Sequence, residues 1–303
     1  MKESKLLRLN SISQLVRALG LPGPSHPLIT LVDYAKIPQG ALTKNQKISL
    51  DFFKISFKPN YKGRTKYGQG YYDFEEGGLA FIKPNQIVFS PENLDQYEGV
   101  ALYFHPDFIR SYPLGTNIHN YGFFSYNVSE ALFLSANEKE IVGNLFTTIA
   151  SELQRNIDHF TQDVLVSQLE LLLNYSNRFY DRQFITRKAV NNDKIRILDQ
   201  LLNDFFEDRN GSKNGPPSVA FICQQMQLSQ RYLSDMLHSL TGMNTQQYIQ
   251  NAIIEKAKEK LSTTELSVSE IAYDLGFEHP QSFSKLFKKQ MNQSPLEFRN
   301  SFN

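Results

Sequence analysis

The chain has 303 residues, of which 41% are hydrophobic and 21% are charged. This composition supports a buried core and excludes global disorder, and the length allows one large domain or two ordinary ones. The 32 Lys and Arg residues balance the 31 Asp and Glu residues, so the net charge of +1 gives no general attraction to nucleic acid. One cysteine, Cys223, excludes an intrachain disulfide and a zinc site built on several thiolates.

The sequence shows no signal for export or membrane insertion. The first ten residues are interrupted by charge and lack the apolar core of a signal peptide. No run approaches the ~20 apolar residues that a membrane-spanning helix needs. We therefore expect a soluble, cytoplasmic protein without membrane contacts.

The front of the chain is expected to be rich in strands. A short helix is predicted over residues 6–19, ended by Gly20 and Pro22. Short β-branched or aromatic runs then alternate with Gly, Pro and Asn turns, which predicts strands at 29–33, 48–57, 79–82, 86–89 and 99–104. Their regular spacing favours a sandwich or a small barrel over a βαβ sheet.

The strand predicted over 48–57 has two different faces. Alternation places Phe53, Ile55 and Phe57 on one side. Phe52, Lys54 and Ser56 lie on the other side. One of the two sets is expected to be core.

Helices are predicted after residue 135. Ser135 and Glu138 form a capping box that begins a helix over 136–155, and further helices are expected from Thr161 to about Tyr180 and over 193–206. A polar, Gly/Pro-rich segment over 207–218 is typical of a linker. The second helix contains more leucines than a single apolar stripe needs. Leu165, Leu169 and Leu172 can face the barrel, while Leu171 or Leu173 points outward. This pattern predicts a homodimer through helices 136–155 and 160–180, although packing within one subunit explains much of the same pattern.

Beyond Pro217 the apolar positions repeat with an offset of about 49 residues. Ile222 and Cys223 correspond to Ile271 and Ala272, and Leu237 corresponds to Phe287 after a one-residue insertion. Each copy has the pattern of a helix, a tight turn and a second helix, which indicates a helix-turn-helix motif. Ser218 and Ser267 are the expected N-caps, Gly276 is expected at a turn that disfavours a Cβ atom, and a helix over 245–261 joins the two copies.

These residues resemble the AraC/XylS family of bacterial transcription regulators. The resemblance is carried by Ser267-Val-Ser-Glu-Ile-Ala-Tyr-Asp-Leu-Gly-Phe277, Gln281-Ser-Phe-Ser-Lys-Leu-Phe-Lys288, Ser294-Pro-Leu-Glu-Phe-Arg299 and, in the first copy, Leu228-Ser-Gln-Arg-Tyr-Leu-Ser-Asp-Met-Leu237. It covers roughly residues 218–300. The front half is similar, more loosely, to the sensor domain of such regulators through segments 72–74, 104–108, 123–126 and 178–184.

The resemblance implies an α+β protein with two domains. Residues 1–190 would form a cupin-like β-barrel sensor and dimerisation domain with helices at its end. Residues 191–303 would form an all-α domain with tandem helix-turn-helix units. The implied function is sequence-specific binding of double-stranded DNA to regulate transcription, as an effector-responsive activator that works with RNA polymerase. The residues themselves leave the effector, the operator and the sign of regulation open.

Candidate DNA contacts follow from the same resemblance. In the second copy Pro280 opens the second helix, and the resemblance implies that Gln281, Ser282 and Lys285 reach base edges. Gln can form two hydrogen bonds with adenine, and Lys can reach the acceptors of guanine. The alternative is that all three are ordinary solvated residues. The first copy offers Arg231, Ser234 and Asp235, where Asp235 departs from a frequently basic position and predicts a weaker or more selective reader. Candidate phosphate contacts, each of which could simply be solubilising, are Lys288, Lys289, Lys256 and Lys260.

The sequence gives no support to an enzyme. The six histidines never occur as His-x-His or His-x-x-x-His, and no Gly-x-Ser-x-Gly, phosphate loop or dinucleotide fingerprint is present. We expect no metal and no cofactor. A small organic effector is expected instead, with Tyr71, Tyr72, Tyr103 and Phe53 as candidate pocket residues, although a packed barrel without a cavity accounts for them equally. The alternative function is a metal-independent cupin-like protein that binds a small molecule and acts through protein contacts.

Overall fold

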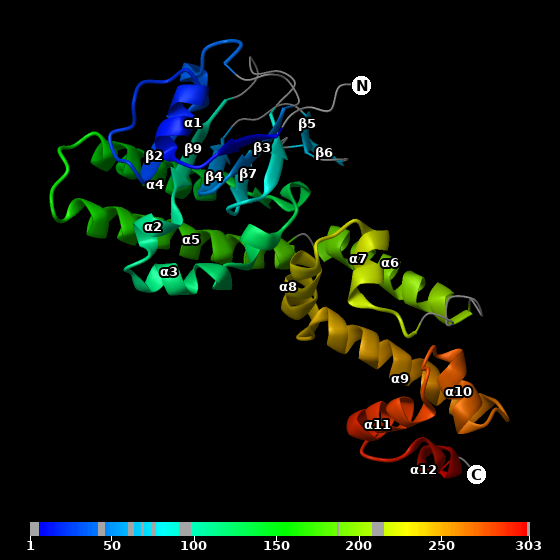
Figure 1. Cartoon of the computed structure of the whole chain (residues 1–303). Helices are drawn as coiled ribbons and strands as arrows, with labels where there is room; N and C mark the ends of the chain where they lie inside the picture. The colour runs from blue at the N-terminus through cyan, green and yellow to red at the C-terminus, as the bar shows by residue number, and fades with distance from the viewer. Residues whose placement is uncertain are drawn as a thin grey trace. The chain divides into compact units, whose positions relative to one another are not determined.

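A computed structural model of the chain describes residues 6–41, 46–59, 64–67, 70–73, 77–90, 98–186, 188–207 and 215–301. The chain divides into two compact units, Met1–Gln183 and Phe184–Asn303 (Figure 1). The described part of the first unit mixes strands and helices, and that of the second is helical. The boundary proposed from the sequence, between residues 190 and 191, falls inside helix α6 (Lys188–Glu207).

The strands of the first unit form three sheets. Their orders are β1-β3-β8, β10-β7-β4-β9-β2 and β5-β6. The described strands leave open edges at β2 and β10, so they do not close into the barrel that the family resemblance implies. The strands are β1 (Leu7–Leu9), β2 (Ile29–Asp33), β3 (Lys47–Leu50), β4 (Phe53–Lys58), β5 (Arg64–Tyr67), β6 (Gly70–Asp73), β7 (Gly78–Ile82), β8 (Ile87–Phe89), β9 (Val100–Phe104) and β10 (Leu132–Phe133).

Two predicted elements differ from the observed ones. The helix expected over 6–19 begins only at Ile12, where Ser11 caps α1 (Ile12–Ala18), because Leu7–Leu9 pair with β3 and satisfy their backbone groups there. The strand expected over 48–57 is interrupted at Asp51 and Phe52. Its first part is β3 of the small sheet, and its second part is β4 of the five-stranded sheet.

The five-stranded sheet is buried on both faces. On one face Phe57 packs on Phe146 of α4 (Ala136–Leu153), with ring centroids 5.4 Å apart, and Phe81 packs near Tyr180 of α5 (Thr161–Thr186). The other face packs against the three-stranded sheet in an apolar cluster that includes Ile48, Val32 and Tyr103. The prediction that one side of β4 is core is confirmed, and the other side is buried as well, because every residue of β4 is buried.

Lys58 on β4 is a buried lysine. Burial, reinforced by the positive charge of Lys54, lowers the pKa of Lys58 to about 7 from its usual 10.5. Between pH 7 and pH 10.5, Lys58 is protonated in the unfolded chain but has lost its proton in the folded chain. The free energy of unfolding therefore rises with pH in this window.

We expect Lys58→Met to remove this pH dependence. For one fully shifted group the free energy of unfolding rises by up to about 1.4 kcal/mol per pH unit above pH 7. Urea unfolding at pH 7, 8 and 9 measures the slope for the parent chain and the variant, and Lys83→Met, which changes an exposed lysine, serves as the control. Equal slopes in the parent and the Lys58→Met variant would contradict the assignment.

A buried carboxylate, that of Glu138, links α4 to α5. The predicted capping box at the start of α4 is confirmed: Glu138 Oε2 accepts from Ser135 N at 2.8 Å. Arg182 of α5 donates Nε to Glu138 Oε1 at 3.0 Å and Nη2 to Phe133 O at 2.8 Å. The remaining short helices are α2 (Pro106–Ile109), α3 (Pro113–Asn117) and the 3-10 turns η1 (Tyr34–Lys36), η3 (Ile118–Asn120), η4 (Gly122–Ser125) and η5 (Val128–Glu130). Among the described residues, none of the helices has the length and hydropathy that crossing a bilayer requires.

The second unit consists of helices that lie around α9 (Thr245–Thr263) (Figure 1). Near the start of α9, the Tyr248 hydroxyl donates to Asp199 of α6 at 2.8 Å. Just beyond the end of α9, the carbonyl oxygen of Leu266 accepts a hydrogen bond from Arg299 at 2.6 Å. The predicted caps at Ser218 and Ser267 are confirmed by bonds from Phe221 N and Glu270 N. The other helices are α7 (Val219–Met226), α8 (Gln230–Thr241), α10 (Val268–Asp274), α11 (Pro280–Met291) and α12 (Pro295–Asn300).

Candidate nucleic-acid interface

Each predicted helix-turn-helix motif is present as a short helix, a turn and a longer helix. α7 and α8 form the first motif, and α10 and α11 form the second. Both turns pass through a left-handed residue, Gln227 at φ 55° and Gly276 at φ 88°. A Cβ atom on Gly276 would lie 2.7 Å from the carbonyl oxygen of Gly215, which confirms the expected need for glycine.

α11 separates an apolar face from a polar one. Phe283 and Phe287 are fully buried, and their rings contact Phe277 and Phe298. The opposite face carries the exposed residues Gln281, Ser282, Lys285, Lys288 and Lys289. Their spacing of one, four, seven and eight residues along a helix places them on one side. The structure thus brings together all the candidate DNA contacts of the second motif.

The first motif presents a narrower polar face. Arg231 Nε donates to Asp235 Oδ2 at 2.9 Å, so the two candidate base contacts pair with each other. Ser234 is half-buried. Tyr232, which aligns with the exposed Ser282 of the second motif, is buried: its hydroxyl accepts from Lys194 of α6 at 3.2 Å.

The lysines of α9 are engaged in ion pairs. Lys256 Nζ lies 2.9 Å from Glu207 and 3.0 Å from Glu259, and the hydrogen bond to Glu207 raises the pKa of Lys256. Lys260 Nζ lies 3.2 Å from Asp274. A phosphate would have to displace these carboxylates, which already neutralise the ammonium groups. The pairing carboxylates come from α6, α9 and α10, beyond the local sequence, and Lys256 and Lys260 stay candidate phosphate contacts.

Two of the candidate effector residues, Phe53 and Tyr103, lie on opposite faces of the five-stranded sheet. Phe53 stacks on Phe104, 4.9 Å between centroids, on the face that also holds Phe124. Tyr103 lies in the cluster on the opposite face of the same sheet. The side chains of Tyr71 and Tyr72 lie outside the described residues. Phe53 and Tyr103 therefore cannot line the same pocket.

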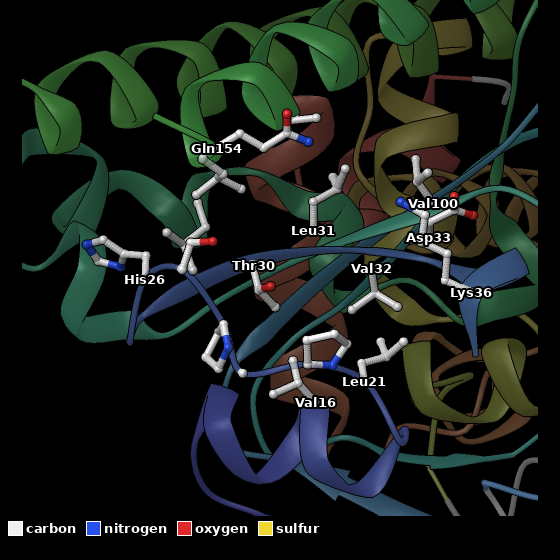
Figure 2. A pocket seen from close by; sticks show the side chains of 17 residues that line it. Val16, Leu21, His26, Thr30, Leu31, Val32, Asp33, Lys36, Val100 and Gln154 are labelled. Carbon is white, nitrogen blue, oxygen red and sulfur yellow. The ribbon is translucent and has the colours of Figure 1, made fainter. Parts of the chain in front are cut away.

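A cavity of about 560 Å³ lies along the edge strand β2, between α1 and the end of α4 (Figure 2). Figure 2 shows His26 at one end of it and Asp33 and Lys36 at the other, with Gln154 above the strand and Leu21 below. Neither Phe53 nor Tyr103 is among the residues that line this cavity. The part of the chain that the structure describes contains no group of three or more His, Cys, Asp and Glu side chains placed to hold a metal ion.

The chain is similar to known helix-turn-helix proteins in its C-terminal part. A family described as "Helix-turn-helix domain" matches residues 222–301, from α7 to α12. The chain is 32% identical over 137 residues to the HTH-type transcriptional activator RhaR of Enterobacter sp. (strain 638). It is also 32% identical over 139 residues to the HTH-type transcriptional activator RhaS of Escherichia coli (strain SE11). These matches cover 45% and 46% of this chain and 45% of each relative, so the chain spans less than half the length of the relatives.

Among solved structures, the C-terminal domain of the two-component response regulator yesN from Fusobacterium nucleatum subsp. nucleatum is similar to this chain. The identity is 32%, and the match covers 33% of this chain and 95% of that chain with a TM-score of 0.29.

Proposed function

Because this chain belongs to the AraC/XylS family of transcription regulators, we propose that it binds operator DNA sequence-specifically through its two helix-turn-helix motifs. The observation that carries this proposal is the exposed polar face of α11, where three lysines, a glutamine and a serine share one side. The described residues offer Lys285, Lys288 and Lys289 no ion pair, in contrast to the lysines of α9.

The two motifs have unequal parts in this proposal. α11 enters a major groove, with Gln281 and Lys285 at base edges and Lys288 and Lys289 at phosphates. α8 enters the next major groove on the same side of the duplex, about 34 Å away. The ion pair of Arg231 with Asp235 lowers the charge that α8 presents, which makes it the weaker reader.

We expect Gln281→Ala and Lys285→Ala each to weaken binding to the preferred site by about 1–3 kcal/mol, because each removes one base contact. Fluorescence anisotropy measures the affinity on a site selected from random duplex DNA, with an unrelated duplex for comparison. Lys288→Ala is the matched variant: it should weaken both duplexes alike and reduce the salt dependence of binding.

Unchanged specific binding in both Gln281→Ala and Lys285→Ala would show that α11 is not the recognition helix. Loss of binding to the two duplexes in equal measure would reassign these side chains to phosphate contacts.

The first unit is proposed to pair two copies of the chain. Leu165, Leu169, Leu172 and Leu173 are fully buried within the unit. Leu171 is 46% exposed, and Phe160 and Val164 extend the apolar stripe toward the start of α5. Exposed apolar stripes on helices usually bury against a partner, which here is a second copy.

Leu171→Asp is expected to dissociate the dimer, because it places a charge in the apolar stripe. Sedimentation velocity at tens of micromolar should show a dimer for the parent chain and a monomer for the variant. Asn177→Asp adds the same charge at an exposed position of α5 about 120° around the helix from Leu171, outside the stripe, and should leave the dimer intact. A parent chain that sediments as a monomer with and without DNA would remove this part of the proposal.

The remaining parts of the proposed function concern regulation. The relatives RhaR and RhaS are transcriptional activators by description, and we extend activation, and with it contact with RNA polymerase, to this chain. The facing sheets of the first unit are proposed to act as a metal-free, cupin-like sensor for a small organic effector. Such an effector acts through its different affinities for DNA-competent and incompetent states. The alternative of a protein that acts only through protein contacts leaves the polar face of α11 unexplained.

A further inference from the structure

The five-stranded sheet has an open edge at β2, and the cavity of about 560 Å³ runs along this edge (Figure 2). One wall is the end of α4, where Ala150 and Leu153 line the cavity. The other wall includes Val16 of α1 and Leu21 just beyond that helix. Most of the lining residues are apolar. The cavity is therefore a groove between two apolar walls, with the edge of a strand as its floor.

The hydrogen bonds from β2 to β9 fix which backbone groups of β2 face the groove. At one end of the antiparallel pair, His105 N donates to Leu28 O at 2.7 Å. At the other end, Tyr34 N donates to Gly99 O at 3.0 Å. Hydrogen-bonded pairs alternate along an antiparallel ladder, so every even-numbered residue of β2 bonds to β9. The residues that direct their N–H and C=O groups the other way, into the groove, are Ile29, Leu31 and Asp33.

These three residues form a regular row of hydrogen-bonding groups. Residues two apart on a strand repeat about every 7 Å, so donors and acceptors follow one another along the groove at that spacing. Within the described ranges of the chain, no atom forms a hydrogen bond with them. Ile29 is only 1% exposed, and buried backbone groups are nearly always paired. Such a row is complementary to the backbone of one further extended segment.

The two walls limit what this segment can be. Figure 2 shows Leu31 on the side of Gln154 and Val32 on the side of Val16 and Leu21. A segment beside β2 directs its side chains alternately to these two sides, and both sides are apolar. The β2 strand of a second copy fits poorly, because it carries its own α1 and α4 on the same two sides. The groove therefore favours a single extended segment with apolar side chains on both of its faces.

The groove is charged at one end, where Asp33 and Lys36 lie (Figure 2). Asp33 Oδ1 accepts a hydrogen bond from Ala35 N at 3.0 Å. No carboxylate of the described residues forms an ion pair with Lys36, which is exposed. At the other end burial lowers the pKa of His26, so this side chain is neutral at pH 7. The Lys36 ammonium thus complements an acidic residue in the segment at this end.

We propose that the groove binds an extended segment of a partner protein, which pairs antiparallel with β2 as a sixth strand of the sheet. The segment carries small or branched apolar side chains opposite the five residues of β2. An acidic residue at its start meets Lys36. Main-chain hydrogen bonds supply the affinity, and the two walls select the side chains. This role adds a protein partner to the first unit and does not depend on the proposed binding of DNA.

Fluorescence anisotropy on the full chain tests the groove with a library of synthetic heptapeptides. Each peptide is a glutamate followed by six residues drawn from Val, Leu, Ala and Thr. The tightest binder is then N-methylated on one or the other set of alternate residues. We expect one set to weaken binding at least tenfold, because those amides face β2, and the other set to have little effect. Glutamine in place of the glutamate should weaken binding by about twofold to fivefold, as for an exposed ion pair.

Two variants change the groove from different elements. Leu31→Pro removes the central outward N–H without touching a bond to β9, and edge strands accept proline at such positions. Ala150→Phe fills the wall that α4 provides. Each should weaken the peptide at least tenfold, whereas Leu31→Val keeps the N–H and should bind like the parent chain. Lys36→Met should make the glutamate and glutamine peptides equal, and the exposed control Lys83→Met should leave their difference unchanged.

Three results would contradict a strand-binding groove: a folded parent chain that binds no member of the library, equal binding of the two N-methylated peptides, or binding that survives in both the Leu31→Pro and Ala150→Phe variants. Sedimentation velocity on the same variants detects a different occupant. Dissociation of a parent dimer by Leu31→Pro would show that a second copy occupies the groove, and the partner segment would then be wrong.

Discussion

Replacing Phe287 with alanine is expected to unfold the second helix-turn-helix motif in a large fraction of molecules and to abolish specific DNA binding. Phe287 is fully buried on α11. Its ring centroid lies 5.8 Å from that of Phe283 on the same helix and 5.5 Å from that of Phe298 on α12, so it joins the two helices. Truncating such a phenylalanine costs about 3–5 kcal/mol, because the lost burial is accompanied by a cavity. A small helical unit has little stability beyond that amount.

Hydrogen exchange of the backbone amides in residues 268–300 measures this effect locally. Protection should fall in α10, α11 and α12 together, since these helices share one core. Leu296→Ala is the matched control, because Leu296 lies on α12 but is 57% exposed. The amides of this variant should keep protection close to that of the parent chain. Full protection and full DNA affinity in the Phe287→Ala variant would show that this aromatic core does not hold the proposed recognition helix in place.

The second large effect is expected from Glu138→Ala in the first unit. Glu138 is 8% exposed, caps the start of α4 and receives two hydrogen bonds from Arg182 of α5. Its removal takes away the carboxylate that pairs with the Arg182 guanidinium, 31% exposed in its side chain, and leaves Ser135 N without its bond. We expect a loss of about 3 kcal/mol in the free energy of unfolding.

Urea unfolding followed by circular dichroism compares this variant with Glu270→Ala. Glu270 closes the same kind of capping box at Ser267 but is exposed, and no arginine of the described residues donates to it. Its removal should have a clearly smaller effect. Glu138→Gln retains an acceptor for Ser135 N and loses only the charge, so it should fall between the two. Equal losses for Glu138→Ala and Glu270→Ala would show that the bond to Arg182 adds nothing to stability.

The features that the sequence alone predicted correctly depend on neighbours within a few residues. The capping box at Ser135 and the N-cap at Ser267 require only a side chain and an amide three positions away. The left-handed turn at Gly276 is likewise local in origin. The repeat that identified the second unit arises because both motifs bury the same side of each helix, as Leu237 and Phe287 show. Short-range backbone chemistry and helical periodicity suffice for such predictions.

The features that only the tertiary structure decided depend on which distant segments meet. Leu7–Leu9 form a strand because β3 lies beside them, and both faces of β4 are buried because helices cover one face and a second sheet covers the other. Lys256 is paired because α6 brings Glu207 to it. Phe53 and Tyr103 lie on opposite faces because the register of β4 with β9 sets Phe53 against Phe104 and Lys54 against Tyr103. Strand register and helix docking are long-range choices, and a change of one residue in register would exchange the two faces of the sheet.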